Sequence, residues 1–192
     1  MHIAVTLRKT CSLARILANN SSSTFRKLWY QLSSNVSIGH NFSAGPGTIL
    51  TATDGGKIII GNNVSIGKHV KLTSRTADII VGDDVTIGDG CIIVALSGIV
   101  IGKGAMLAEY VVVRDQDHLV CKGVPSAKQF RSQELIVGMN AWIGCKATLL
   151  RGAYVSDSCI IGAHALVRRF VPERSLAVGI PARIIDRSDY KS

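Results

Sequence analysis

Aliphatic residues recur at every sixth position along most of the chain, and a glycine often follows them. The longest unbroken series comprises Val137, Ile143, Leu149, Val155, Ile161 and Val167. Shorter series with the same spacing lie upstream: Ile60, Ile66 and Leu72; Val81, Ile87 and Ile93; and Ile101, Leu107 and Val113. This period matches neither the turn of an α-helix nor the two-residue alternation of a single strand.

The period predicts an all-β solenoid, in which the chain makes a short strand, turns and repeats. Each aliphatic residue then points inward and stacks on its counterpart in the next coil. Glycine suits the turns, where φ is positive or space is tight. Three units complete one triangular coil, so that the series fall into triplets. An antiparallel sandwich of short strands is the alternative, and the unbroken run of aliphatic residues argues against it.

One long interruption separates Val113 from Val137. We expect the chain to leave the coil here as a loop over residues 114–135 and then to resume the period. Insertions at a solenoid corner often carry function. The predicted solenoid domain spans residues 35–171.

The two ends of the chain depart from the period. Residues 1–34 have helical apolar spacing with basic residues between. This pattern predicts that they cap the open end of the solenoid or pack in an oligomer, and binding to a membrane surface is the alternative. Residues 172–192 form a closing segment and tail, in which Pro181 ends the coil before a short strand or helix.

Composition narrows the class of protein. Hydrophobic residues make up 47% and charged residues 18%, which argues against disorder. The net charge of +9 favours anionic partners, although the charges are scattered and solubility alone would explain them. No apolar run is long enough to predict a membrane span. The cysteines are odd in number and lack metal-ligand spacing, which indicates a reduced, cytoplasmic protein: Cys11, Cys91, Cys121, Cys145 and Cys159.

Three short motifs stand in the second half of the chain: "NAWIG" at Asn140–Gly144, "IGA" at Ile161–Ala163 and "GIPAR" at Gly179–Arg183. With "FRKLWYQLSSNVSIGHN" near the start, they resemble the hexapeptide-repeat acyltransferases, in the branch of galactoside, maltose and polysaccharide O-acetyltransferases. The resemblance implies a left-handed parallel β-helix and a homotrimer. It also implies that acetyl-CoA lies in a groove between neighbouring subunits.

Acetyl transfer to an alcohol needs a base for the hydroxyl proton, and histidine suits that role. His118 leads directly into the interruption, and its position resembles that of the catalytic histidine of the family. Asp115 or Asp117 could orient the imidazole or bind acceptor hydroxyls, while a backbone group is the alternative partner. Arg114 could meet an anionic acceptor. A zinc centre of the γ-carbonic anhydrase type would need three histidines, so we expect no metal.

The resemblance also assigns cofactor contacts. It implies that Trp142 positions the acetyl end of acetyl-CoA, that Gly144, Cys145 and Ala163 line the pantetheine path, and that guanidinium groups bind the phosphates. The arginines concerned are Arg168, Arg169 and Arg183. The pair Arg168–Arg169 replaces the usual Thr-Lys of the family.

The sequence therefore predicts an acetyl-CoA-dependent O-acetyltransferase with His118 as general base and with direct attack. The expected acceptor is a sugar hydroxyl on a polysaccharide, a glycolipid or a lipid-linked precursor, not a nucleic acid. N-acetylation of an amino sugar or nucleotide sugar is one alternative, and a non-catalytic scaffold is another. The expected location is the cytoplasm, where the basic N-terminal segment could touch the inner membrane surface.

Overall fold

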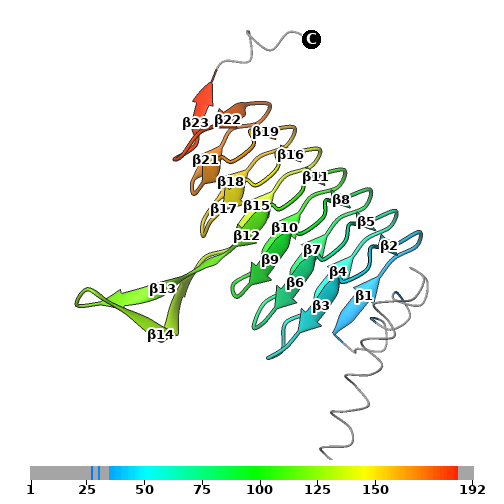
Figure 1. Ribbon diagram of the computed structural model, residues 1–192, viewed down its shortest axis with the longest axis horizontal. Coiled ribbons are helices and arrows are strands. Elements are labelled where there is room, and N and C mark those ends of the chain that lie inside the picture. Colours follow the sequence, from blue (N-terminus) through cyan, green and yellow to red (C-terminus); the bar gives the residue numbers. More distant parts are fainter. Residues whose placement is uncertain (1–26, 28–29, 31–34, 186–192) are drawn as a thin grey trace, which may run out of the picture.

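The chain winds through three β-sheets around a single core and forms a β-solenoid (Figure 1). The strands of these sheets pair in parallel, except that the last strand, Arg183–Ile185, is antiparallel. The computed structural model describes residues 27, 30 and 35–185. The predicted all-β fold and its six-residue period are confirmed for this part of the chain. Apart from Lys27 and Tyr30, the predicted N-terminal segment lies outside the described residues.

Each coil contributes one strand to each sheet. The first, seven-stranded sheet contains β1 (Val36–Ile38), β4 (Ile58–Ile60), β7 (Ile79–Val81), β10 (Ile99–Ile101), β15 (Leu135–Val137), β18 (Tyr154–Val155) and β21 (Phe170–Val171). The second, eight-stranded sheet contains β2 (Ser43–Ala44), β5 (Ser65–Ile66), β8 (Thr86–Ile87), β11 (Met106–Leu107), β16 (Trp142–Ile143), β19 (Ile160–Ile161), β22 (Leu176–Val178) and β23 (Arg183–Ile185). The third, six-stranded sheet contains β3 (Ile49–Ala52), β6 (Lys71–Ser74), β9 (Ile92–Ala95), β12 (Val112–Arg114), β17 (Thr148–Leu149) and β20 (Leu166–Val167).

The residues of the six-residue period form three columns inside the solenoid, and each is at most 3% exposed. In the first sheet the column is Ile60, Val81, Ile101, Val137 and Val155. In the second it is Ile66, Ile87, Leu107, Ile143 and Ile161. In the third it is Leu72, Ile93, Val113, Leu149 and Val167. In-register stacking of like residues removes a continuous apolar surface from water.

Several residues at the corners adopt left-handed backbone conformations, and two of them are histidines. His69 and His164 have φ of 56° and 60°, at equivalent corners between the second and third sheets. Asn and Asp, which tolerate this conformation best after glycine, take several of the other corners. The two histidines therefore stand at positions that the turn geometry selects.

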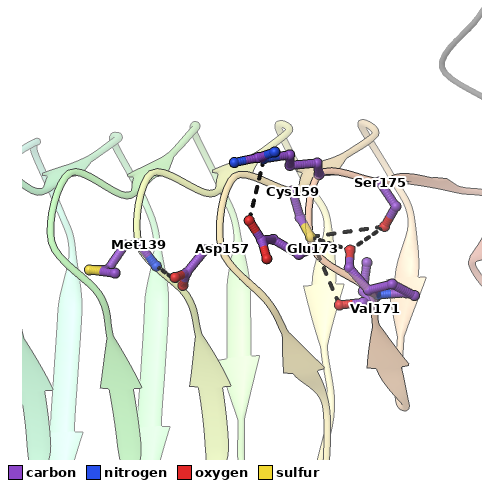
Figure 2. A network of polar contacts seen from close by, with 8 residues as sticks. Met139, Asp157, Cys159, Val171, Glu173 and Ser175 are labelled. Atoms are coloured by element: carbon purple, nitrogen blue, oxygen red, sulfur yellow. Dashed lines mark hydrogen bonds and ion pairs between the residues drawn. The ribbon is translucent and has the colours of Figure 1, made fainter.

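Polar side chains tie successive coils together at the corners (Figure 2). A carboxylate oxygen of Asp157 accepts a hydrogen bond from the backbone N–H of Met139 at 2.7 Å. At the same corner as Asp157, the thiol of Cys159 donates to the carbonyl of Pro172 in the next coil at 2.8 Å. The hydroxyl of Ser175, within that next coil, donates to the same carbonyl at 2.5 Å. Backbone groups that the tight turns would leave unpaired are satisfied in this way.

Described residues outside the coils contact both ends of the solenoid. The Tyr30 ring is buried against the first coil, and its hydroxyl donates to the carbonyl of Thr48 at 2.6 Å. The ammonium group of Lys27 donates to the carbonyl of Gly39. At the other end, β23 pairs antiparallel with β22, beyond Pro181. Whether residues 1–34 cap the first coil stays a prediction, because only Lys27 and Tyr30 of this segment lie within the described residues.

The predicted loop over residues 114–135 is a β-hairpin instead. Arg114 still belongs to β12, and Leu135 already begins β15. Between them β13 (Gln116–Cys121) and β14 (Val124–Ser132) pair antiparallel and project from the solenoid (Figure 1). Lys122 and Gly123 form the two-residue turn, and both have positive φ, as a type I′ hairpin turn requires.

Candidate active site

The base of the hairpin is fixed by a buried carboxylate. Asp115 is fully buried, and its oxygens accept hydrogen bonds from the backbone N–H groups of Leu96, Ser97 and Gly98 at 2.6 to 2.9 Å. These three residues form the corner between β9 and β10 in the preceding coil. The hydroxyl of Ser97 also donates to that of Ser132 at 2.6 Å. The hairpin is thereby anchored to the coil that precedes it.

His118 lies on β13, and one hydrogen bond selects the tautomer of its imidazole ring. Its Nδ1 lies 2.7 Å from the carbonyl oxygen of Ser126 on β14. Because a carbonyl can only accept, the proton must sit on Nδ1, and in the neutral ring Nε2 then keeps its lone pair. The ring packs on Phe130, its cross-strand neighbour, with 4.7 Å between ring centroids. The hydrogen bond thus selects the Nδ1–H tautomer of the neutral ring.

Neither aspartate of the "RDQDH" segment is a hydrogen-bond partner of the imidazole. Asp115 accepts hydrogen bonds from backbone N–H groups of the preceding coil, and Asp117 accepts one from Nε of Arg151 at 2.8 Å. The hydrogen-bond partner of the His118 ring is the backbone carbonyl of Ser126. A backbone group was the expected alternative to an aspartate. The physical reason is that both carboxylates accept hydrogen bonds from other groups, although Asp117 lines the same cavity as His118.

A cavity of about 250 Å³ opens beside His118. It brings together three of the residues that the sequence singled out: Arg114, Asp117 and His118. Its remaining lining residues are Gln116, Phe130 and Leu150. A small polar group with an adjoining apolar surface could enter and meet the imidazole here.

A second cavity, of about 320 Å³, lies at the C-terminal end of the solenoid and contains the three predicted arginines. Arg168 and Arg169 occupy the corner between β20 and β21, and Arg183 begins β23. No ion pair involves any of them in the part of the chain that the structure describes. Three uncompensated guanidinium groups around one cavity suit phosphate groups well.

The remaining predicted cofactor contacts lie on another face. Trp142 projects from β16 of the second sheet and is 45% exposed. Gly144 and Cys145 follow it at the next corner, and Ala163 occupies the same corner one coil later. A side chain at Gly144 would collide with the backbone of Ile161 and Ala163, at 2.6 to 2.7 Å, so glycine is required by coil packing. One chain therefore presents the predicted site residues on two separate faces.

Three residues near His118 were not anticipated from the sequence: Ser126, Phe130 and Arg151. They reach His118 or Asp117 only because the hairpin folds back and the next coil passes beneath it. No spacing rule connects them, although the Lys-Gly turn is a weak hairpin signal. Within the described residues, no cluster of three or more His, Cys, Asp or Glu side chains could hold a metal ion, and no helix suits a membrane span.

Several known proteins are similar to this chain in sequence. No protein-family model matches the chain. WbbJ of Escherichia coli K12, assigned as a lipopolysaccharide biosynthesis O-acetyl transferase, is 23% identical over 82% of this chain and 74% of its own length. Galactoside O-acetyltransferase of the same organism is 25% identical over 65% of this chain, and polysialic acid O-acetyltransferase of E. coli O1:K1 is 27% identical over 72%. The match spans 54% and 39% of these two relatives.

Solved structures share the fold. A variant of AntD, an N-acyltransferase from Bacillus cereus in complex with dTDP and coenzyme A, has a TM-score of 0.72 and 19% identity, over 86% of this chain and 91% of AntD. The hexapeptide-repeat acetyltransferase VCA0836 of Vibrio cholerae has a TM-score of 0.63 and 20% identity, over 94% and 90% of the two chains. In sequence this chain is related to sugar O-acetyltransferases, and in fold it is a β-solenoid of the hexapeptide-repeat acetyltransferase type.

Proposed function

We propose that the protein transfers an acetyl group from acetyl-CoA to a sugar hydroxyl, with His118 as the general base. The observation that carries this proposal is the hydrogen bond from Nδ1 of His118 to the Ser126 carbonyl. It leaves Nε2 as the acceptor nitrogen of the neutral ring, and His118 lines an open cavity. The named O-acetyltransferase relatives support the reaction class.

The proposed chemistry needs only a proton carrier and positioned reactants. Nε2 of His118 removes the proton of the acceptor hydroxyl while the oxygen attacks the thioester carbon. The tetrahedral intermediate then expels the thiolate of coenzyme A, which takes the proton back from the imidazolium. A carbon–oxygen bond forms, the carbon–sulfur bond breaks, and the ring returns to its starting state. No acyl-enzyme is needed.

The residues present fit acetyl-CoA as co-substrate. The cavity of Arg168, Arg169 and Arg183 provides cationic groups for the phosphates of coenzyme A. We propose that the acetyl end is held beside Trp142, on the face that the second sheet presents. Coenzyme A bound to AntD, which shares the fold, is consistent with this assignment.

We also propose a homotrimer, because the predicted site residues of one chain lie on two faces and the family resemblance implies three subunits. In the proposed assembly, the second sheet of one subunit lies beside the hairpin of its neighbour. His118 and Trp142 would then meet across the interface, although they lie on different faces of one chain. Cyclic symmetry repeats such a site at every interface.

N-acetylation of an amino sugar is the second candidate, because AntD is an N-acyltransferase of the same fold. The same base would serve an amine, which must also lose a proton. The sequence relatives named above are O-acetyltransferases, and for that reason we place the hydroxyl acceptor first.

The test is a thiol-release assay with acetyl-CoA against a panel of sugars, amino sugars and nucleotide sugars. We expect one class to be acetylated, and we expect His118→Ala to lower the rate by about 10²- to 10⁴-fold. Acetyl-CoA should still raise the melting temperature of this variant. His69→Asn is the matched control, because it removes a histidine at a left-handed corner that asparagine tolerates.

Two outcomes would contradict the proposal. Full transfer activity in His118→Ala would show that His118 is not the general base. Absence of both a thermal shift and thioester hydrolysis with millimolar acetyl-CoA would favour the scaffold alternative instead.

A further inference from the structure

The cavity of His118 contains the guanidinium group of Arg114, which has no counter-ion among the described residues. Arg114 is the last residue of β12, next to the inward Val113, so strand alternation turns its side chain outward from the third sheet. It is exposed and lines the same cavity as His118. The strand on which it sits is fixed on both sides, by pairing with β9 and β17.

The nearby carboxylates are already used by other groups. Asp115 is enclosed by the backbone N–H groups of the preceding corner, and Asp117 pairs with Arg151 at 2.8 Å. Within the described residues, Arg114 takes part in no ion pair and its side chain in no hydrogen bond. The hairpin adds exposed Lys122, Lys128 and Arg131. The surroundings of His118 therefore carry an excess of positive charge.

We propose that the acceptor is an acidic sugar, whose carboxylate or phosphate group binds Arg114 beside the hydroxyl that becomes acetylated. This inference rests on the proposed function. The planar fork of arginine suits both kinds of oxyanion, because two parallel hydrogen bonds can form to one group. A fixed anion contact would also orient the acceptor, so that one hydroxyl reaches Nε2 of His118.

Coenzyme A does not account for Arg114 in the same way. The thioester must lie beside His118 during transfer, and the long pantetheine arm separates it from the phosphates. The cavity of Arg168, Arg169 and Arg183 already offers cationic groups for those phosphates. An anionic group next to His118 therefore belongs to the acceptor.

The experiment compares acceptors that share a sugar ring and differ in the group at carbon 6, with acetyl-CoA and the full chain. One pair is galactose and galacturonic acid, and a second is glucose and glucose 6-phosphate, each also as short oligosaccharides where these exist. The measured quantity is the ratio of kcat/KM for the acidic acceptor to that for the neutral one. The two pairs distinguish a carboxylate from a phosphate.

We expect one acidic acceptor to be preferred by the wild-type protein by at least about tenfold, which corresponds to one charge-assisted hydrogen-bond contact. Arg114→Gln should lower this preference by about 10- to 100-fold. Arg114→Lys should restore part of it, because the charge returns without the fork. The matched control is Arg131→Gln, which removes the same charge from the hairpin outside the cavity and should leave the preference within about twofold.

Equal use of acidic and neutral acceptors would overturn the inference while acetyl transfer itself upheld the proposed function. An equal loss of this preference in Arg131→Gln would also overturn the inference. The preference would then come from the overall positive charge of the hairpin and not from a contact with Arg114. Binding of the same sugars, measured by saturation-transfer NMR with coenzyme A present, provides a readout that needs no turnover. If no acidic sugar binds, or if Arg114→Gln binds it as well as the wild type does, Arg114 has no such role.

Discussion

Two aspartates separated by one residue have opposite surroundings. Asp115 is enclosed in a corner where three backbone N–H groups converge on it, whereas Asp117 is exposed and meets Arg151. The sequence "RDQDH" made them equivalent candidates for orienting His118. The fold gives the first an anchoring contact and places the second at the edge of the cavity.

We expect Asp115→Asn to destabilise the protein by about 2–4 kcal/mol, because an amide N–H₂ would face backbone donors in a buried corner. Asp117→Asn should cost less than about 1 kcal/mol, since its ion pair is exposed. Urea unfolding of both variants measures the difference. If Asp115→Asn unfolds like the wild type but loses catalytic rate, the carboxylate acts on His118 after all.

Catalytic rate separates the two aspartates as well. Because the Ser126 carbonyl holds the imidazole, we expect Asp117→Asn to lower kcat by less than about tenfold, below the usual contribution of a general base. A larger loss in kcat with intact stability would show that Asp117 approaches His118 during turnover.

At the scale of elements, the hairpin is the feature that sequence periodicity described least well. The six-residue period located both ends of the hairpin. Val113, in the column of the third sheet, precedes the hairpin, and Val137, in the column of the first sheet, follows it; both are fully buried. The strands β13 and β14 were predicted as a loop, because most of their residues are exposed and lack a clear apolar alternation. Cross-strand pairing and the Lys122–Gly123 turn form the hairpin instead.

We expect the hairpin to be separable from the solenoid. Replacing residues 117–131 by Asn-Gly keeps Asp115, Gln116 and Ser132 at the base, where an antiparallel pair accepts a two-residue turn. Circular dichroism should then retain the β signal, acetyl-CoA should still shift the melting temperature, and transfer should vanish. Substantial transfer by the shortened protein would show that the hairpin does not carry the base.

At the scale of the whole molecule, the solenoid is a rigid support with different chemistry on its faces. Its coils contact mainly their neighbours, so stability accumulates along the axis while each corner is free to differ. The hairpin leaves the corner between the third and first sheets, and Trp142 projects from the second sheet. In the proposed trimer, a neighbouring copy of the chain supplies the second of these two features to each site.

Mixing of two inactive variants tests the proposed trimer. If His118 and Trp142 act across an interface, co-expression of His118→Ala with Trp142→Ala should restore activity at about one quarter of the sites in randomly mixed trimers. Each variant alone should stay inactive. Mixing His118→Ala with the double variant is the control and should restore nothing. Without recovery in the first mixture, the two residues must act within one chain or Trp142 must be dispensable.

The sequence by itself determined the solenoid, its triplet columns and the place where the chain leaves it. This was possible because each coil buries aliphatic residues at a fixed spacing, and that requirement is visible in one dimension. It also singled out His118, Arg114 and the three arginines that share a cavity.

Only the tertiary structure decided what each of these residues contacts. The partner of His118 is a carbonyl on the opposite hairpin strand, and carbonyls carry no sequence signature. Asp115 is held by a corner that lies earlier in the chain by a full coil. Hydrogen-bond partners depend on pairing register and on the stacking of coils, which the six-residue period leaves open at the corners.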